Sequence, residues 1–127
     1  MKKSLTKPEW VMMSVLWENP EMTISGIIAA MNDKMDWKYN TYVTYAKRLC
    51  AKGLAAYRTY GRDNFYYPLV DREQCIIAES ENIIDKVSDR SMKALLIQMI
   101  KSSDLSPKDL TEIKKLIDQL NKEGNGK

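Results

Sequence analysis

The sequence contains no histidine, and this absence excludes many kinds of catalytic and metal site at once. Histidine is the commonest general base at neutral pH, a member of the Ser-His-Asp and Cys-His arrangements, and a common ligand of zinc and haem iron. Cysteine is scarce as well: Cys50 and Cys75 form no Cys-x-x-Cys pair, which excludes a zinc ribbon and a thioredoxin-type motif. We therefore predict a protein that is not an enzyme, uses no cofactor or metal, and keeps both cysteines as buried reduced thiols.

Long apolar runs are also absent. No segment approaches the roughly 18 uninterrupted apolar residues of a membrane span. Lys7, Glu9 and Glu18 interrupt the N-terminal stretch that would otherwise resemble a signal peptide. We therefore expect a cytoplasmic protein without membrane insertion, and its 127 residues suit one ordinary domain or two small ones.

The charge is small overall but concentrated in one part of the chain. The formal net charge is +3. The window 34–62 holds seven basic residues and one acid, Asp36, for a net of +6, whereas residues 71–127 carry a net of −1. A solvated face is the simplest explanation for a run of lysines, but a localised excess of this size favours a polyanionic partner such as nucleic acid.

Three helices are predicted in the first half of the chain. Thr6–Glu9 has the pattern of a capping box with proline in the first turn, and Asn19-Pro20 ends the helix that follows. Thr23 can cap a second helix, and Gly53 can end a third. Helical spacing gives the third helix one buried stripe, formed by Tyr42, Tyr45, Ala46, Leu49 and Cys50.

A β-hairpin is predicted directly after the third helix. Two aromatic-rich extended runs, 54–60 and 64–70, flank the Gly-containing loop 61–63. Three helices followed by a two-stranded ribbon form the winged helix-turn-helix arrangement. We therefore predict a mainly α fold with a small β-hairpin, in which residues 1–70 are a winged-helix DNA-binding domain.

The exposed side of the third helix is the predicted DNA-reading face. It is polar and basic and comprises Asn40, Thr41, Val43, Thr44, Lys47 and Arg48. Lys47 and Arg48 could simply keep a helix soluble, but their clustering on this face favours DNA contact. Arg58 and Arg62 in the hairpin are candidates for contacts with the DNA backbone or minor groove.

Residues 71–127 are predicted to form three amphipathic helices. Their apolar stripes include Ile83, Ile84, Val87, Leu95, Leu96, Met99, Leu110, Ile113, Leu116, Ile117 and Leu120. These helices could fold back on the first part or pack against a second copy. We favour a helical dimerisation domain over 71–127, because the stripes are broad for so short a chain and a helix-turn-helix reader usually spans two half-sites as a dimer.

With these elements placed, the sequence resembles the penicillinase-repressor (BlaI/MecI) family of bacterial winged-helix transcription repressors. The resemblance rests on LTKPEWVMMSVLW at 5–17, DWKYNTYVTYAKRLCAKGL at 36–54, FYYPLV at 65–70 and DLS at 104–106. It covers nearly the whole chain, and the combined pattern is more specific than any single position.

The resemblance implies a homodimeric repressor that binds a palindromic double-stranded operator and is released by an inducing signal. Carried over by position, the groove-facing or phosphate-facing residues are Lys38, Asn40, Thr41, Val43, Thr44, Lys47 and Arg48. Many members of the family have a basic residue where this chain has Val43, so an apolar contact, for example with a thymine methyl group, replaces a polar one here.

The resemblance also implies a route of induction. In antibiotic-responsive members a membrane sensor with a metalloprotease domain leads to cleavage of an Asn-Phe bond in the helix before the last one. The corresponding pair here is Gln98-Met99. Copper-responsive relatives carry a C-terminal Cys-x-Cys cluster, whereas this chain has no cysteine after Cys75.

Two other functions are weighed beside DNA binding. Winged helices sometimes bind protein partners, so a protein-interaction module without specific DNA binding is the alternative. An enzyme has no support, because histidine, a glycine-rich phosphate loop and a carboxylate cluster are all missing. Four tyrosines are predicted to serve the core rather than to stack on bases: Tyr42, Tyr45, Tyr66 and Tyr67.

Overall fold

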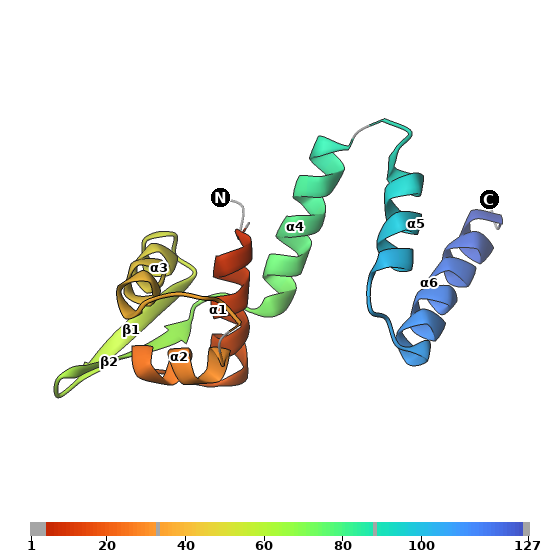
Figure 1. The fold of residues 1–127 in the computed structure, drawn as a ribbon. Coiled ribbons are helices and arrows are strands. Elements are labelled where there is room, and N and C mark those ends of the chain that lie inside the picture. The colour runs from red at the N-terminus through yellow and green to blue at the C-terminus, as the bar shows by residue number, and fades with distance from the viewer. Residues whose placement is uncertain (1–4, 33, 88, 126–127) are drawn as a thin grey trace. The chain divides into compact units, whose positions relative to one another are not determined.

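The computed structural model describes residues 5–32, 34–87 and 89–125 and divides the chain into two compact units, 1–86 and 87–127. Figure 1 shows the order of the elements. They are α1 (Lys7–Glu18), α2 (Ile24–Met31), α3 (Tyr39–Ala51), β1 (Ala55–Tyr60), β2 (Asp63–Pro68), α4 (Arg72–Lys86), α5 (Met92–Ser102) and α6 (Pro107–Asn125). The predicted fold class, mainly α with one hairpin, is confirmed.

Local capping signals set the start of the first two helices as predicted. The Thr6 hydroxyl accepts a hydrogen bond from the Glu9 N–H, and the Glu9 carboxylate accepts one from the Thr6 N–H, which completes the capping box of α1. The Thr23 hydroxyl accepts a hydrogen bond from the Gly26 N–H at the start of α2. Gly53 follows α3 with a φ of +75°, a left-handed conformation that favours glycine.

The core of the first unit lies between α1, α2, α3 and the hairpin. Methionine and aliphatic side chains of all three helices fill it, and Met12, Met13 and Ile27 are fully buried. The apolar stripe predicted for α3 faces this core, since its Tyr42, Ala46 and Leu49 are buried, while Tyr45 and Cys50 are half-buried. Because the core takes this stripe, the opposite side of α3 faces outward.

The hairpin is joined by a two-residue turn, one residue shorter than the predicted loop. Strands β1 and β2 are antiparallel, with Tyr60 opposite Asp63 and Gly61-Arg62 between them. Gly61 has a φ of +63°, as a tight hairpin turn requires. Two backbone hydrogen bonds between Met22 and Tyr66, of 2.9 and 2.8 Å, attach the segment before α2 to β2. These elements together form a winged helix.

Helix α4 extends the first unit beyond the expected boundary. Its Cys75 and Ala78 are buried, and the Trp17 indole N–H donates to the Val70 carbonyl just before the helix at 2.9 Å. The compact unit therefore ends at residue 86, whereas the sequence predicted a division after residue 70. The reason is that α4 contributes apolar side chains to the core that α1 and the hairpin form. The part of 71–127 that mediates dimerisation stays a prediction.

The second unit consists of α5 and α6. Ser106 and Asp109 exchange hydrogen bonds of 3.0 and 3.1 Å at the start of α6, as the Ser-Pro-x-Asp pattern predicts. None of the side chains of α5 is buried in the chain. No helix among the described residues combines the length and apolar character needed to cross a bilayer.

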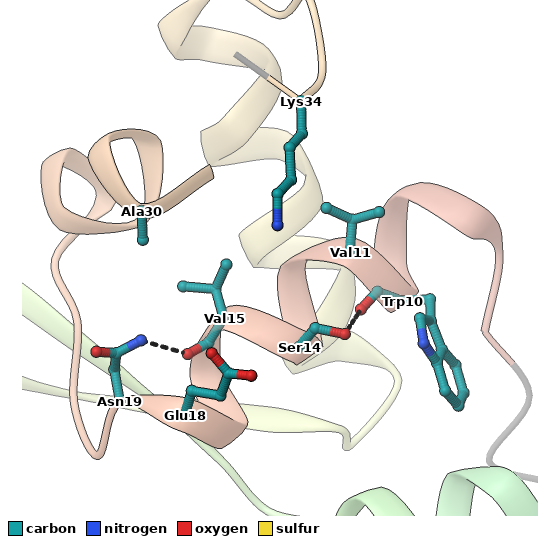
Figure 2. Close-up of a pocket in the computed structure, with 8 residues that line it drawn as sticks. All are labelled: Trp10, Val11, Ser14, Val15, Glu18, Asn19, Ala30 and Lys34. Carbon is teal, nitrogen blue, oxygen red and sulfur yellow. Dashed lines mark hydrogen bonds between the residues drawn. The ribbon is translucent and has the colours of Figure 1, made fainter. Parts of the chain in front are cut away.

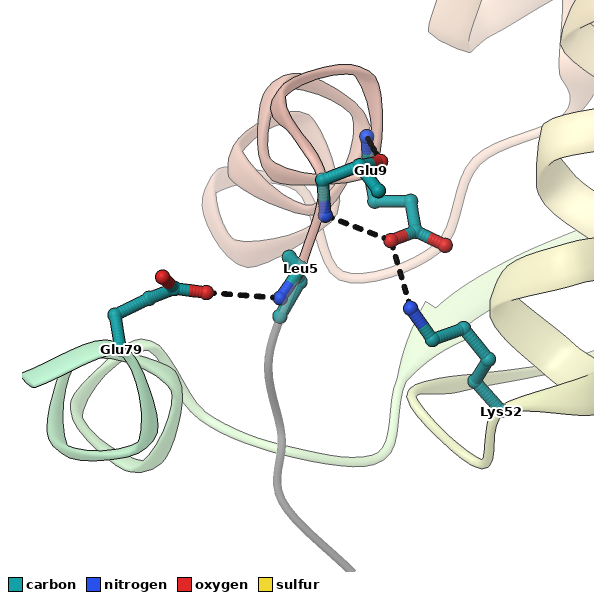
Figure 3. Close-up of polar contacts among 5 residues, drawn as sticks. Leu5, Glu9, Lys52 and Glu79 are labelled. Atoms are coloured by element: carbon teal, nitrogen blue, oxygen red, sulfur yellow. Dashed lines mark hydrogen bonds and ion pairs between the residues drawn. The ribbon is translucent and has the colours of Figure 1, made fainter. Parts of the chain in front are cut away.

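An ion pair between the buried Glu9 and the partly exposed Lys52 joins the start of α1 to the end of α3 (Figure 3). Glu9 is fully buried, and its Oε1 accepts hydrogen bonds from the Thr6 N–H and from Lys52 Nζ, each at 2.8 Å. On the other side of α1, the Leu5 N–H donates to the Glu79 carboxylate of α4 at 2.9 Å. The first turn of α1 is therefore fixed to both α3 and α4.

This ion pair makes stability depend on pH. Burial raises the pKa of Glu9, but the hydrogen bonds from Lys52 and Thr6 and the charge of Lys52 outweigh it, so the pKa lies below its ordinary value of 4.5. The stabilisation is therefore complete above pH 4.5 and is lost as the pH falls through the lowered pKa. We expect the free energy of unfolding of the wild type to fall more steeply with acidification than that of Glu9→Gln. Urea denaturation at a series of pH values measures both slopes, and equal slopes would contradict this assignment.

Candidate nucleic-acid interface

The outward side of α3 presents most of the predicted reading face. Asn40, Thr44, Lys47 and Arg48 are exposed, and Thr41 and Val43 are half-buried. Lys38 is also exposed, but it is the N-cap residue of α3 rather than part of the helix, and its side chain makes no capping hydrogen bond. The first backbone N–H groups of α3 therefore lack a side-chain cap beside a lysine, an arrangement that suits an anion.

The positive charges on α3 are not engaged in ion pairs with acids of the described residues. Within the described part of the chain, neither Lys47 nor Arg48 forms an ion pair with a carboxylate. The Arg48 guanidinium lies over the Tyr45 ring at 4.8 Å, and this ring stacks on Trp37 at 4.7 Å. The aromatic contacts orient Arg48 while leaving its charge available to a ligand.

A polar hollow of about 250 Å³ connects α3 with the hairpin and the start of α2. It brings together Lys47 and Arg62, which are separated in the sequence, and places the acid Asp63 beside them. The complete lining is Thr23, Ile24, Ser25, Tyr39, Val43, Lys47, Arg62, Asp63, Asn64 and Tyr66. Of the predicted helix and wing candidates, Val43, Lys47 and Arg62 therefore share one surface at this hollow.

The sequence interpretation missed several of these residues. No motif in the sequence indicated Tyr39 or Asn64 as site residues, because only the packing of α3 against the hairpin brings them together. Thr23 was recognised only as a helix cap. Thr23 stands directly before the second helix of the helix-turn-helix, and the start of that helix borders the reading helix. This position could have identified Thr23 as a site residue.

Arg58 lies elsewhere on the hairpin and has partners of its own. Its guanidinium is 3.4 Å from the Glu21 carboxylate and 4.8 Å from the centre of the Tyr67 ring. Hydrogen bonds with Tyr60 and Tyr67 and the charge of Glu21 raise the pKa of Arg58 above its ordinary value. Arg58 thus differs from Arg62 at the turn, and its role in DNA contact stays a prediction.

The four tyrosines that were predicted to serve the core are buried to different extents. Tyr42 and Tyr66 are buried, as predicted. Tyr45 and Tyr67 are half-buried, and each supports an arginine through the contacts described above. Neither cysteine forms a disulfide within the described residues; Cys75 is buried and Cys50 half-buried, and burial raises the pKa of Cys50.

A second hollow, of about 210 Å³, lies between α1 and α2 (Figure 2). The Ser14 hydroxyl donates to the Trp10 carbonyl and the Asn19 amide to the Val15 carbonyl, each at 2.8 Å. The Ser14 and Asn19 side chains are therefore occupied by hydrogen bonds to backbone carbonyls of α1, and the charged residues that line the hollow are Glu18 and Lys34.

The predicted cleavage pair lies on α5, and the predicted dimerisation residues lie on α4, α5 and α6, except Val87, which follows α4. Gln98 and Met99 are exposed on α5, and the Gln98 amide donates to the Ser102 hydroxyl at 2.8 Å. Seven of the predicted dimerisation residues are exposed, namely Ile84, Leu96, Met99, Leu110, Leu116, Ile117 and Leu120. The other four are half-buried: Ile83, Val87, Leu95 and Ile113. Large exposed apolar side chains in this number are typical of an interaction surface.

The winged-helix order of elements and the outward basic side of α3 define the class of protein: a winged-helix DNA-binding transcription regulator. The profile of the family described as penicillinase repressor matches residues 5–119. The chain therefore belongs to the penicillinase repressor family, and it is a DNA-binding transcriptional repressor and not an enzyme.

Individual relatives agree with this family. The methicillin resistance regulatory protein MecI of Staphylococcus aureus is 24% identical over 115 residues, which cover 91% of this chain and 94% of that protein. The MecI protein of Staphylococcus epidermidis gives the same values. The penicillinase repressor of Staphylococcus aureus is 19% identical over 120 residues, or 93% of this chain and 94% of that protein.

Solved structures with a similar arrangement are more distant. BpsR of Bordetella bronchiseptica has a TM-score of 0.48 at 16% identity, covering 91% of this chain and 75% of that one. A MarR family protein from Bacillus stearothermophilus has a TM-score of 0.46 at 17% identity, covering 95% and 76%.

Proposed function

We propose that this repressor acts as a cytoplasmic homodimer on a palindromic operator, with α3 of each protomer in the major groove and the hairpin as the wing. The observation that carries the proposal is the two-sided character of α3. Its buried side, with Tyr42, Ala46 and Leu49, fixes it to the core, and its outward side presents Asn40, Lys47 and Arg48. A rigidly held helix with an uncompensated basic side is the usual major-groove reader.

The residues of the interface divide by chemistry into phosphate-binding and base-reading groups. Lys38, Lys47 and Arg62 are proposed to neutralise phosphates, which makes affinity fall steeply with salt. Asn40 and Thr41 are proposed to read base edges, and Val43 to contact a thymine methyl group. Arg48 lies on the same face and is proposed to contact either a phosphate or a base edge.

Thr44 has a more restricted role in this scheme. Its hydroxyl already donates to the Asn40 carbonyl at 2.9 Å. In this geometry it offers only oxygen lone pairs to DNA, so we propose that it accepts a hydrogen bond, for example from the amino group of cytosine or adenine.

Dimerisation is proposed to occur through the apolar side chains of α4, α5 and α6. Exposed Leu110, Leu116, Ile117 and Leu120 lie on α6 at helical spacing, and none of the α5 side chains is buried within the chain. Burial of these groups against a second copy removes apolar surface from water. It also pairs two reading helices for half-sites separated by about one turn of DNA.

Repression then requires no chemistry, because a dimer that occupies a promoter excludes polymerase. We propose that an inducing signal releases the DNA and that a membrane sensor metalloprotease is a candidate partner. The Gln98-Met99 bond lies inside helix α5. Proteolysis at this bond would need local unwinding of α5, and the pair differs from the Asn-Phe bond of the antibiotic-responsive members.

Selection from a library of random DNA duplexes tests the proposal. We expect the full-length chain to enrich a dyad-symmetric sequence with half-site centres about 10 base pairs, or a multiple, apart. Failure to enrich any sequence at low salt would contradict the proposal and favour a winged-helix module that binds protein.

A further inference from the structure

Lys52 connects the far end of the reading helix to the buried carboxylate of Glu9. Lys52 is the C-cap residue of α3, and its backbone N–H donates to the Arg48 carbonyl at 3.0 Å. Its side chain is partly exposed, and its ammonium group contacts the buried Glu9 Oε1 at 2.8 Å (Figure 3). The end of α3 is therefore attached to the first turn of α1 by a charged contact.

The length of α3 amplifies any change at this attachment. A helix rises about 1.5 Å per residue, so Asn40 lies roughly 18 Å along the axis from Lys52. A tilt of about 5° at the Lys52 end would displace Asn40 by about 1.5 Å, roughly half the length of a hydrogen bond. Hydrogen bonds to base edges do not tolerate such a displacement, whereas contacts between long cationic side chains and phosphates do.

The environment of Glu9 suits a positioning role better than a purely stabilising one. Lys52 stays partly exposed, but Glu9 is buried, and the cost of removing a carboxylate from water is repaid only when its charge is paired and its oxygens are hydrogen-bonded. Glu9 Oε2 is buried and has no hydrogen-bond partner among the described residues. Neither residue lines the hollow between α3 and the hairpin, so we expect a change at the pair to affect base contacts through the pose of α3.

We propose that Glu9 and Lys52 are positioning residues that set the angle of α3 and thereby the preference for operator over other DNA. The inference rests on the proposed function, because it assigns a specificity role within the same interface. It predicts a change in discrimination between sequences rather than a uniform change in DNA affinity.

Glu9→Gln provides the main test, because it removes the charge with little change of shape. It also makes the protein more positive, which by long-range electrostatics alone would strengthen binding to every DNA. We expect instead about a tenfold weaker affinity for the selected operator, comparable to one lost base contact, with unchanged or slightly stronger affinity for scrambled duplex. Fluorescence anisotropy titrations with both duplexes measure this ratio.

Matched variants separate positioning from charge and from stability. Glu18→Gln makes the same charge change at an exposed position of α1 and is expected to retain the wild-type ratio. Lys52→Met is expected to lower the ratio of operator affinity to scrambled-duplex affinity, as Glu9→Gln does. Lys52→Arg keeps the charge and is expected to keep the wild-type ratio. Lys34→Met, at an exposed position, is expected to leave the ratio unchanged. Circular dichroism establishes the temperature range in which each variant is folded. If Glu9→Gln does not fold, the Lys52 variants test the positioning role.

The outcomes distinguish this inference from the proposed function. A wild-type chain that does not discriminate operator from scrambled duplex overturns the proposed function itself. The positioning role alone is overturned by a different outcome. In that outcome the wild type discriminates between the duplexes, but Glu9→Gln and Lys52→Met bind operator as tightly as Glu18→Gln and Lys34→Met.

Discussion

Replacing Lys47 and Arg48 together by glutamate is expected to abolish specific operator binding while the protein remains folded and dimeric. Both side chains are exposed on α3, and neither has an ion-pair partner among the described residues. Each reversal turns an attraction to phosphate into a repulsion and prevents the release of condensed counterions. We expect a loss of at least about 100-fold in affinity at moderate salt.

The same double variant should change stability little. Exposed substitutions usually alter the free energy of unfolding by about 0.5 kcal/mol or less, and loss of the Arg48 contact with Tyr45 adds about 0.5–1 kcal/mol. Gel-shift titration measures affinity, and circular dichroism with sedimentation velocity measures fold and assembly. Lys7→Glu with Lys34→Glu is the matched control, since both lysines are exposed outside α3. If the control loses as much affinity as the α3 variant, net charge rather than this surface governs binding.

A fragment ending at Lys86 is expected to be a folded monomer that binds a full operator at least about 100-fold more weakly than the whole chain. The first compact unit closes at residue 86, so the fragment keeps the complete winged helix and α4. It loses α5 and α6, and with them most of the exposed apolar side chains assigned to the dimer. Two linked half-site contacts exceed one by about 10²–10⁴ in affinity.

A shorter fragment ending at Val70 provides the comparison. It lacks Cys75 and Ala78, which are buried against the core, and the Glu79 carboxylate that receives the Leu5 N–H. We expect it to be less stable than the longer fragment by about 2–4 kcal/mol. Urea denaturation compares the two fragments, and sedimentation equilibrium gives their mass. A dimeric 1–86 fragment with undiminished operator affinity would contradict the assignment of dimerisation to the helices that follow.

The elements that the sequence predicted correctly are those with local signals. Each of these signals determines the backbone conformation of only a few neighbouring residues. They are the capping box at Thr6 and Glu9, the cap at Thr23 and the glycines at 53 and 61. The buried side of α3 was also predictable, because a helical stripe of apolar residues has to meet a core.

The features that escaped prediction depend on contacts between distant segments. The amphipathic pattern of α4 did not reveal whether its apolar side meets the first unit or a second copy, and the structure places Cys75 in the core of the first unit. Arg58 was predicted to contact DNA from its charge and its place in the predicted hairpin, which did not reveal its contact with Glu21. Its proximity to Glu21 arises because the Met22–Tyr66 backbone pairing brings the segment before α2 beside the hairpin.

For the candidate site, the sequence identified the residues of α3 but not the surface they form. Lys47 and Arg62 were predicted separately, as parts of a helix and of a wing. Only the folded hairpin brings them to one hollow with Tyr39 and Asn64. Periodicity indicates which side of an element is polar, whereas the neighbours of that side depend on tertiary packing.

We propose that this repressor reads DNA in a sequence-specific way with the basic side of α3. A titration of the full-length wild type against the selected palindromic duplex and a scrambled duplex, over a series of salt concentrations, measures this directly. We expect preferential binding to the palindrome, with the logarithm of the affinity falling steeply and linearly with the logarithm of the salt concentration. Equal affinity for the two duplexes, or no binding to either at low salt, would contradict it.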